Sequence, residues 1–161
     1  MKIDQIAFYA RSVEQIVEIK TMFGLLDAKW IEDQVTAKSL FRDGKWCVNK
    51  ANLLFNYDLG IELEVLSYVD GDHWHINNPL HITKLHEAPQ PFISHVGIHL
   101  ADGEAFPEMV GYKLVQETFT FNHMGEYFGV GQPGHGRTYH YKIFEFTPGS
   151  YIKYIKRIQS K

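Results

Sequence analysis

Five polar side chains stand inside segments that otherwise have the composition of buried β-strands. Gln5, His95 and Lys153 each interrupt a run of branched or aromatic residues, and Glu62 and Glu64 do the same in another strand-like segment. Carboxylate, imidazole and ammonium groups transfer protons in enzymes and stabilise charge there. A polar group taken out of water costs free energy unless it is paired, metal-bound or solvated. A cluster of these side chains would therefore be a candidate site for a small molecule.

An internal repeat predicts that these side chains lie close together. Residues 3–9, Ile-Asp-Gln-Ile-Ala-Phe-Tyr, match residues 93–99, Ile-Ser-His-Val-Gly-Ile-His, without a gap. Branched or aromatic residues coincide along both segments, which have the composition of strands. A two-fold repeat places equivalent positions opposite each other. We therefore expect Gln5 to face His95.

Each half of the chain continues with signals for a helix. Ser12 and Gln15 form a candidate capping box, and apolar residues follow at helical spacing until Gly24. In the second half Asp102 is the corresponding cap, and Pro107 restricts the helix to a short stretch after it. One helix is therefore expected in each half, with the second a few residues shorter.

Each half is also expected to end in a hairpin. The first hairpin has its turn at Gly60 and the second has its turn at Gly149. Alignment of these two glycines pairs Glu64 with Lys153. Because side chains alternate between the faces of a strand, Glu62 and Glu64 should point away from the face that a helix covers.

These expectations describe an α+β domain with two βαβββ modules. The modules span residues 1–68 and 92–161, and residues 69–91 form a linker rich in Pro, Asn and His. The two modules should form a cupped mixed sheet with one helix per module outside it. Trp74 and the histidines of the linker suggest a different function, the contact surface of an interaction protein.

The composition of the chain limits its partners. The 161 residues carry a net charge of -3 without a run of Lys or Arg, so we expect no nucleic-acid partner. No apolar stretch approaches the roughly 20 residues of a membrane-spanning helix, and the first residues do not have the pattern of a signal peptide. Cys47 is the only cysteine, which fits a reducing compartment. We therefore expect a cytoplasmic protein.

Paired βαβββ modules with one polar inward residue on the first and last strand of each resemble the vicinal-oxygen-chelate superfamily. This superfamily includes glyoxalase I, methylmalonyl-CoA epimerase, extradiol dioxygenases, and fosfomycin- and bleomycin-resistance proteins. The resemblance is carried by residues 3–9, 60–66 and 93–98 and covers nearly the whole chain. It implies a small-molecule enzyme with lyase, isomerase, transferase or dioxygenase chemistry on an oxygenated substrate. It also implies a homodimer, since many members build their sites by pairing modules.

The resemblance further implies a divalent cation. In metal-dependent members, four convergent side chains bind a cation that acts as a Lewis acid on two adjacent substrate oxygens. By position, the ligands would be Gln5, Glu64 and His95, with Glu62 as the alternative to Glu64. The sequence does not distinguish Zn, Fe, Mn, Ni and Co. Lys153 stands at the fourth position, and an ammonium group cannot ligate a metal.

Three interpretations of this departure stay open. In the first, a weakened metal site survives on His95, Glu64 and one recruited residue. The candidates for that residue are His99, His123 and Gln5. In the second, no metal binds and Lys153 forms an ion pair with Glu64. In the third, the metal-free pocket binds a small molecule without chemistry, as bleomycin-resistance proteins do. The predicted catalytic residues are Glu64, His95 and Lys153.

Overall fold

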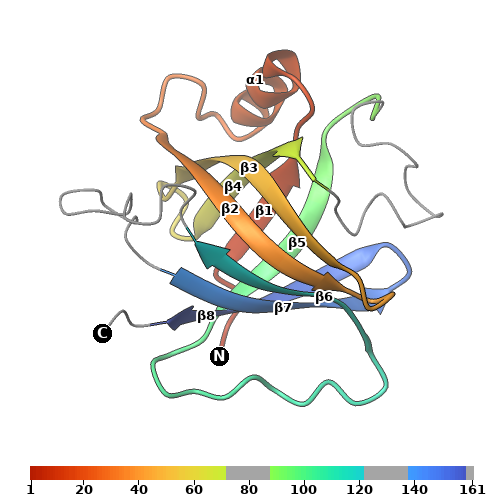
Figure 1. Ribbon diagram of the computed structural model, residues 1–161. Helices are drawn as coiled ribbons and strands as arrows, with labels where there is room; N and C mark the ends of the chain where they lie inside the picture. The colour runs from red at the N-terminus through yellow and green to blue at the C-terminus, as the bar shows by residue number, and fades with distance from the viewer. Residues whose placement is uncertain (72–87, 122–137, 159–161) are drawn as a thin grey trace.

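The computed structural model describes residues 1–71, 88–121 and 138–158, and its strands form a closed barrel (Figure 1). Most of the predicted linker, with Trp74, and the candidate ligand His123 lie outside the described residues. The strands are β1 (Gln5–Tyr9), β2 (Ile31–Phe41), β3 (Trp46–Asn56), β4 (Glu62–Asp70), β5 (Phe92–His99), β6 (Lys113–Phe121), β7 (Thr138–Thr147) and β8 (Ser150–Ile158). Around the barrel they follow the order β1-β4-β3-β2-β6-β7-β8-β5.

The strand pairing has a two-fold pattern. The first half runs β1-β4-β3-β2 and the second half runs β5-β8-β7-β6. In each half the first strand is parallel to the last, with Ala7 opposite Glu64 in one and Gly97 opposite Lys153 in the other. The halves meet at two antiparallel seams, β1 with β5 and β2 with β6. Glu64 and Lys153 therefore occupy equivalent positions.

The expected α+β fold, a cupped mixed sheet with one helix outside each module, is wrong. Residues 36–41 of β2 pair with residues 116–121 of β6 and close the sheet into a barrel. Closure satisfies the backbone N–H and C=O groups that an open cup would leave along two strand edges. β2 and β3 are long strands that turn at Gly44, where φ is 81°.

Both predicted hairpins are confirmed. β3 and β4 are antiparallel neighbours with Gly60 in the turn between them, and β7 and β8 are antiparallel neighbours with Gly149 in theirs. Both glycines have a φ of 84°, a left-handed conformation that favours glycine.

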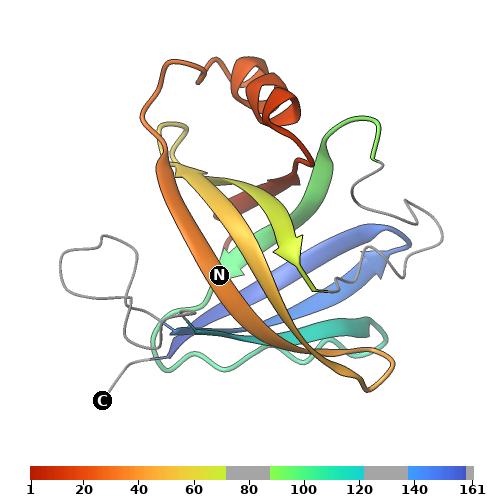
Figure 2. The same cartoon turned by 45° about the horizontal axis from the view of Figure 1, so that its top comes forward.

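The first predicted helix is confirmed as α1 (Val13–Met22), which lies outside the barrel (Figure 2). The hydroxyl of Ser12 caps it by accepting a hydrogen bond of 3.2 Å from the backbone N–H of Gln15. Ile19 packs with Leu63 and Val65 on the outer face of β4, as the alternation along that strand predicted. In the described part of the chain, no helix has both the length and the apolar character needed to cross a membrane.

The second predicted helix, over residues 102–110, is wrong. The segment has no helical hydrogen-bonding pattern and runs as an open loop (Figure 1). Gly103 takes a φ of 80° and Pro107 lacks a backbone donor, and both features oppose a helix of this short length. The apolar residues still cover the barrel, because Phe106 and Met109 pack on the outer faces of β5, β7 and β8. The segment covers the second half of the barrel, as α1 covers the first, without forming a helix.

Removal of the Ile19 side chain is expected to destabilise the protein strongly. Ile19 is 0% exposed between α1 and β4, so Ile19→Ala should lower the free energy of unfolding by about 2–5 kcal/mol. Val13 lies on the same helix and is 71% exposed, so Val13→Ala is a matched control with an expected effect within about 0.5 kcal/mol. Urea unfolding followed by circular dichroism measures both. Equal effects of the two variants would contradict the packing of α1 on the barrel.

Candidate functional site

The polar residues singled out above lie on adjacent strands and share the inner face of the barrel. β1 lies between β4 and β5, with Gln5 opposite Glu62 and Ala7 opposite both Glu64 and His95. Residues opposite each other in a sheet point to the same side of it. On the far side of β5, Gly97 of this inner face stands opposite Lys153 of β8. The barrel thus brings the five side chains to one region of its interior.

Gln5 faces His95, as the repeat predicted. The Oε1 atom of Gln5 lies 2.9 Å from Nε2 of His95, and the Nε2 group of Gln5 donates to Oε1 of Glu62 at 2.5 Å. Since the Gln5 amide oxygen only accepts, Nε2 of His95 must carry the proton. Nδ1 of His95 lies 3.0 Å from the hydroxyl of Ser94, which can donate to it. Gln5 and Ser94 thus fix the orientation of the His95 ring, with the Nε2 proton directed to Gln5.

A β-bulge in β5 turns His95 inward. Ala7 pairs with His95, but the next residue of β1, Phe8, pairs with Ile93, so Ser94 is an extra residue in β5. Such an extra residue shifts the alternation of side chains by one position. Phe92 and His95 can consequently both face the interior, although side chains three positions apart lie on opposite faces of a regular strand.

Gly97 makes room for the Gln5 side chain. A Cβ atom at position 97 would lie 2.9 Å from Cβ of Gln5 and even closer to its amide oxygen. Real Cβ atoms essentially never approach other atoms so closely. The hydrogen bond between Gln5 and His95 therefore depends on the absence of a side chain at Gly97.

Glu64 is a buried carboxyl group beside His95. It is 4% exposed, and its Oε1 atom lies 3.9 Å from Nε2 of His95. Burial raises the pKa of Glu64 to about 7, against the opposing effect of the positive charge of Lys153, and Glu62 raises it further. A carboxyl group with this pKa can both release and accept a proton near neutral pH.

Lys153 lies in the same interior but turns toward an aromatic ring. Its Nζ atom is 3.8 Å from the centroid of the Tyr141 ring instead of in contact with the Glu64 carboxylate. Burial lowers the pKa of Lys153, while the negative charges of Glu64 and Glu62 raise it. The two unlike charges therefore interact through space, without the direct ion pair that the sequence suggested.

Three inward side chains of the barrel remain partly exposed. Lys153, Tyr141 and Tyr68 stand at inward positions, yet each keeps part of its surface exposed. An inward side chain of a closed barrel stays accessible only where space remains inside the barrel or at its mouth. Eight-stranded barrels are wide enough to hold one small ligand. The partly exposed side of the barrel interior at Lys153 is thus the candidate ligand site.

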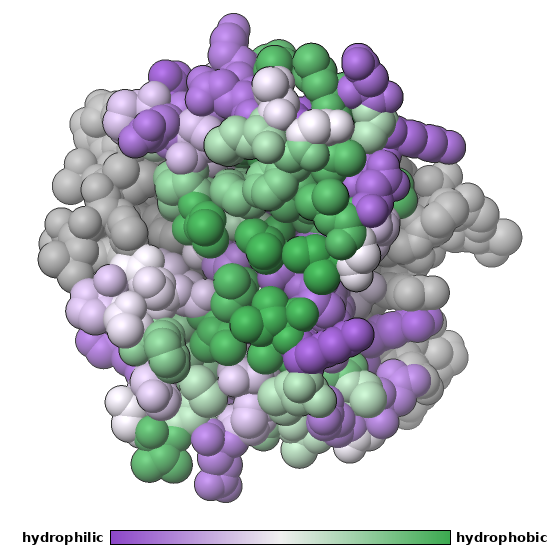
Figure 3. Space-filling view, turned by 180° about the vertical axis from the view of Figure 1, so that it is seen from behind, coloured by the Kyte–Doolittle hydropathy of each residue, from purple (hydrophilic) through white to green (hydrophobic). Residues whose placement is uncertain are grey.

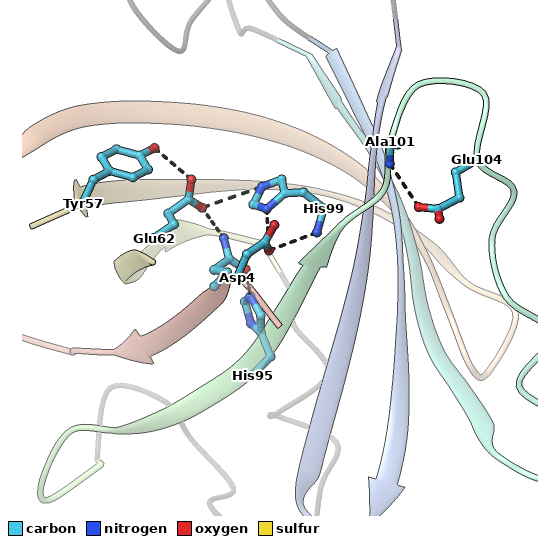
Figure 4. Close-up of polar contacts among 8 residues, drawn as sticks. Asp4, Tyr57, Glu62, His95, His99, Ala101 and Glu104 are labelled. Carbon is cyan, nitrogen blue, oxygen red and sulfur yellow. Dashed lines mark hydrogen bonds and ion pairs between the residues drawn. The ribbon is translucent and has the colours of Figure 1, made fainter. Parts of the chain in front are cut away.

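A second polar cluster lies next to Gln5, and two of its members, Asp4 and Tyr57, were not indicated by the sequence. Asp4 accepts hydrogen bonds from the backbone N–H of His99 at 3.1 Å and from Nδ1 of His99 at 2.9 Å (Figure 4). Tyr57 donates to Oε2 of Glu62 at 2.8 Å. Asp4 precedes β1, where strand alternation no longer applies, and Tyr57 belongs to a turn, so neither had a pattern that could place it. This cluster holds Glu62 in position for its bond with Gln5.

The expected ligand set fits a resident divalent cation poorly. Nε2 of His95 carries a proton that it donates to Gln5, and Gln5 is fixed by Glu62. A cation bound to these atoms would need His95 in its other tautomer and would stand near the charge of Lys153. No group of three His, Cys, Asp or Glu residues that could hold a metal occurs within residues 1–71, 88–121 and 138–158. The assignment of Gln5, Glu64 and His95 as ligands therefore stays a prediction.

Large apolar side chains are also exposed on the outside of the barrel. Ile3 is 53% exposed and Ile93 is 57% exposed, and hydrophobic residues gather in the middle of the face seen in Figure 3. Contiguous apolar patches often mark interaction sites, whereas scattered apolar residues are normal on a protein surface. The homodimer implied by the resemblance remains a prediction.

Comparison with known proteins gives no match, either to a model of a protein family or to a curated protein. The function therefore has to be argued from the residues of the site.

The Gly97→Ala substitution is expected to disturb the site and the fold together. Because its Cβ would overlap Gln5, the free energy of unfolding should fall by about 1–3 kcal/mol. In a Gln5→Ala background, Gly97→Ala should lower the free energy of unfolding by less, because the Gln5 amide group that the new Cβ would displace is absent. A double-mutant cycle from urea unfolding measures this coupling, and strictly additive effects would contradict the close approach.

Glu64 is expected to make the protein less stable as the pH rises from 4.5 to about 7. Its pKa is raised in the folded state, so in this interval the folded protein binds more protons than the unfolded chain, and stability falls with rising pH. A shift of this size corresponds to at most about 3 kcal/mol. Urea unfolding at several pH values should show that Glu64→Gln gains stability relative to the wild type across the interval. A difference that does not change with pH would contradict the raised pKa.

Proposed function

We propose that this protein is a small-molecule enzyme that transfers a proton to or from an oxygen-bearing ligand inside its barrel, without a metal ion. This is a metal-free form of the activity that the resemblance to the vicinal-oxygen-chelate superfamily implies. The observation that carries the proposal is the convergence of a buried carboxyl, an imidazole and an ammonium group, from Glu64, His95 and Lys153, on the inner face of one barrel.

Glu64 is the acid–base group in this proposal. Its carboxyl is buried beside His95, and among the described residues no ion pair holds it closer than the 3.9 Å to Nε2 of His95. The carboxyl is therefore available to exchange a proton with a ligand. A pKa of about 7 supports this role, because acid–base catalysis is most efficient when the pKa of the group lies near the working pH. Gln5 and Ser94 fix the ring of His95, which in turn forms one wall beside the carboxyl.

Lys153 is the group that stabilises negative charge on the ligand. When Glu64 takes a proton from a carbon or hydroxyl of the ligand, the negative charge moves from the carboxylate to a ligand oxygen. The ammonium of Lys153 interacts with the Glu64 carboxylate through space. It therefore also stabilises the negative charge when that charge has moved from Glu64 to a nearby ligand oxygen. A fixed charge in a buried site acts more strongly than it would in water and needs no reorganisation during the reaction.

The absence of a metal from the proposal follows from the chemistry of the donor set. Lys153 brings a positive charge to the position at which the superfamily has its last ligand. His95 and Gln5 already use their facing atoms on each other. The positive charge that a cation would supply to a ligand oxygen comes from Lys153 instead.

The proposal predicts exchange of carbon-bound hydrogen in a suitable substrate. The protein is incubated in D2O with a panel of 2-hydroxy ketones and vicinal diols, and deuterium incorporation is followed by proton NMR. Glu64→Gln keeps the shape of the side chain but cannot take a proton, so exchange should slow by about 10²–10⁴-fold. Glu18→Gln, an exposed carboxylate of α1, is the matched control and should exchange at the wild-type rate.

Added chelator should leave the exchange rate of the wild type unchanged. Exchange that is lost with chelator and restored with a divalent cation would overturn the metal-free assignment. Exchange that survives in Glu64→Gln would overturn the role of Glu64.

A second candidate function is ligand binding without turnover. The aromatic lining of the barrel supports it, because Tyr9 lies 5.9 Å from Tyr68 and 5.2 Å from Phe92 between ring centroids. Aromatic side chains provide large contact areas for apolar or planar ligands. Saturable binding of a panel compound without any exchange of its hydrogens would favour this candidate.

A further inference from the structure

We propose that Lys153 is also a nucleophile that captures a small ketone or aldehyde as an imine inside the barrel. The inference goes beyond the proton transfer proposed above. It needs the same interior space, but it does not need Glu64 to remove a proton from the ligand. The inference names the carbonyl group as the part of the ligand that the site recognises.

The surroundings of Lys153 are those of a reactive amine. Its strand neighbours at the same level of the barrel are Ile143, which is 0% exposed, and Gly97, which has no side chain. The ring of Tyr141 lies 3.8 Å from Nζ. Apolar and aromatic neighbours do not solvate an ammonium ion as water does, and burial accordingly lowers the pKa of Lys153. Lysines in apolar surroundings of this kind act as nucleophiles toward carbonyl compounds.

Imine formation also needs a group that donates a proton, and Glu64 lies in the same interior. Glu64 and Lys153 occupy equivalent inward positions in the two halves of the barrel, on either side of the β1–β5 strand pair. A carboxyl group that donates a proton and an amine that attacks the carbonyl carbon are the pair that this reaction uses.

The step conserves atoms and electrons. The lone pair of Nζ forms a bond to the carbonyl carbon, the π electrons move to the oxygen, and a proton passes from Nζ to that oxygen to give a carbinolamine. Glu64 then donates its proton to the hydroxyl, which leaves as water while the C=N bond forms. The products are a cationic imine, water and the Glu64 carboxylate, whose negative charge stabilises the imine. No oxidant or reductant takes part.

The test traps the imine by reduction. The wild-type protein is incubated at pH 7 with hydroxyacetone and sodium cyanoborohydride, which converts an imine into a stable secondary amine. Intact-mass measurement and peptide mapping then identify the modified lysine. We expect one adduct per chain, located at Lys153.

Two variants separate the chemistry of Lys153 from its charge and from general lysine reactivity. Lys153→Arg keeps the positive charge but cannot form an imine, so the adduct should be lost. Lys153→Met removes both the charge and the amine. It replaces Lys153→Arg if the larger arginine side chain prevents that variant from folding, and circular dichroism checks the folding of each variant. Lys156→Met is the matched control and should be modified like the wild type, since Lys156 belongs to the same strand but lies 5.7 Å from the Phe106 ring on the outer face.

The outcomes distinguish this inference from the proposed function. No adduct, or adducts spread over many lysines to the same extent in the wild type and in Lys153→Arg, would overturn the inference. If hydrogen exchange occurs in D2O without such an adduct, the inference fails and the proposed function stands. An adduct confined to Lys153, together with exchange that Glu64→Gln leaves unchanged, supports the inference and overturns the proposed function.

Discussion

The antiparallel pairing of β1 with β5 is the constraint on which the arrangement of the site depends. It joins the first strands of the two halves, and each of these strands is parallel to the last strand of its own half. The pairing therefore brings Glu64 on β4 and Lys153 on β8 to the two sides of a central strand pair that carries Gln5 and His95. A slip of one residue in this register would turn the inward side chains outward. The bulge at Ser94 allows both Phe92 and His95 to stay inside.

Unlike charges at equivalent positions lower the electrostatic cost of placing ionisable groups inside the barrel. The two-fold pattern places Glu64 and Lys153 at corresponding points of the two halves. Two carboxylates at such positions would repel each other, and two ammonium groups would do the same, unless a counterion stood between them. The pair here compensates itself through space, although burial still shifts the pKa of each group toward its neutral form. Buried ionisable groups cost stability, and sites that bind or transform ligands are where such a cost is commonly found.

The sequence predicted the first helix and both hairpins but not the pairing of β2 with β6 that closes the barrel. Strand alternation placed Leu63 and Val65 under a helix, and Ser12 marked the beginning of that helix, because both signals depend on residues close together in the chain. The second helix failed where the signal was shortest and contained Pro107. Closure depends on contacts such as the hydrogen bond of 2.8 Å between Ser39 and Thr118, which are 79 residues apart. No local pattern encodes a pairing between such distant strands.

The sequence by itself determined which polar side chains face the interior, because the alternation of side chains along a strand is a local property of the backbone. Gln5, Glu64, His95 and Lys153 were identified in this way. The repeat also predicted that Gln5 faces His95, and the two side chains lie within hydrogen-bonding distance. Only the tertiary structure decided where the Lys153 side chain turns, which is to Tyr141 rather than to Glu64. Contacts between strands depend on register, strand order and side-chain conformation together, and these are settled only when the whole barrel packs.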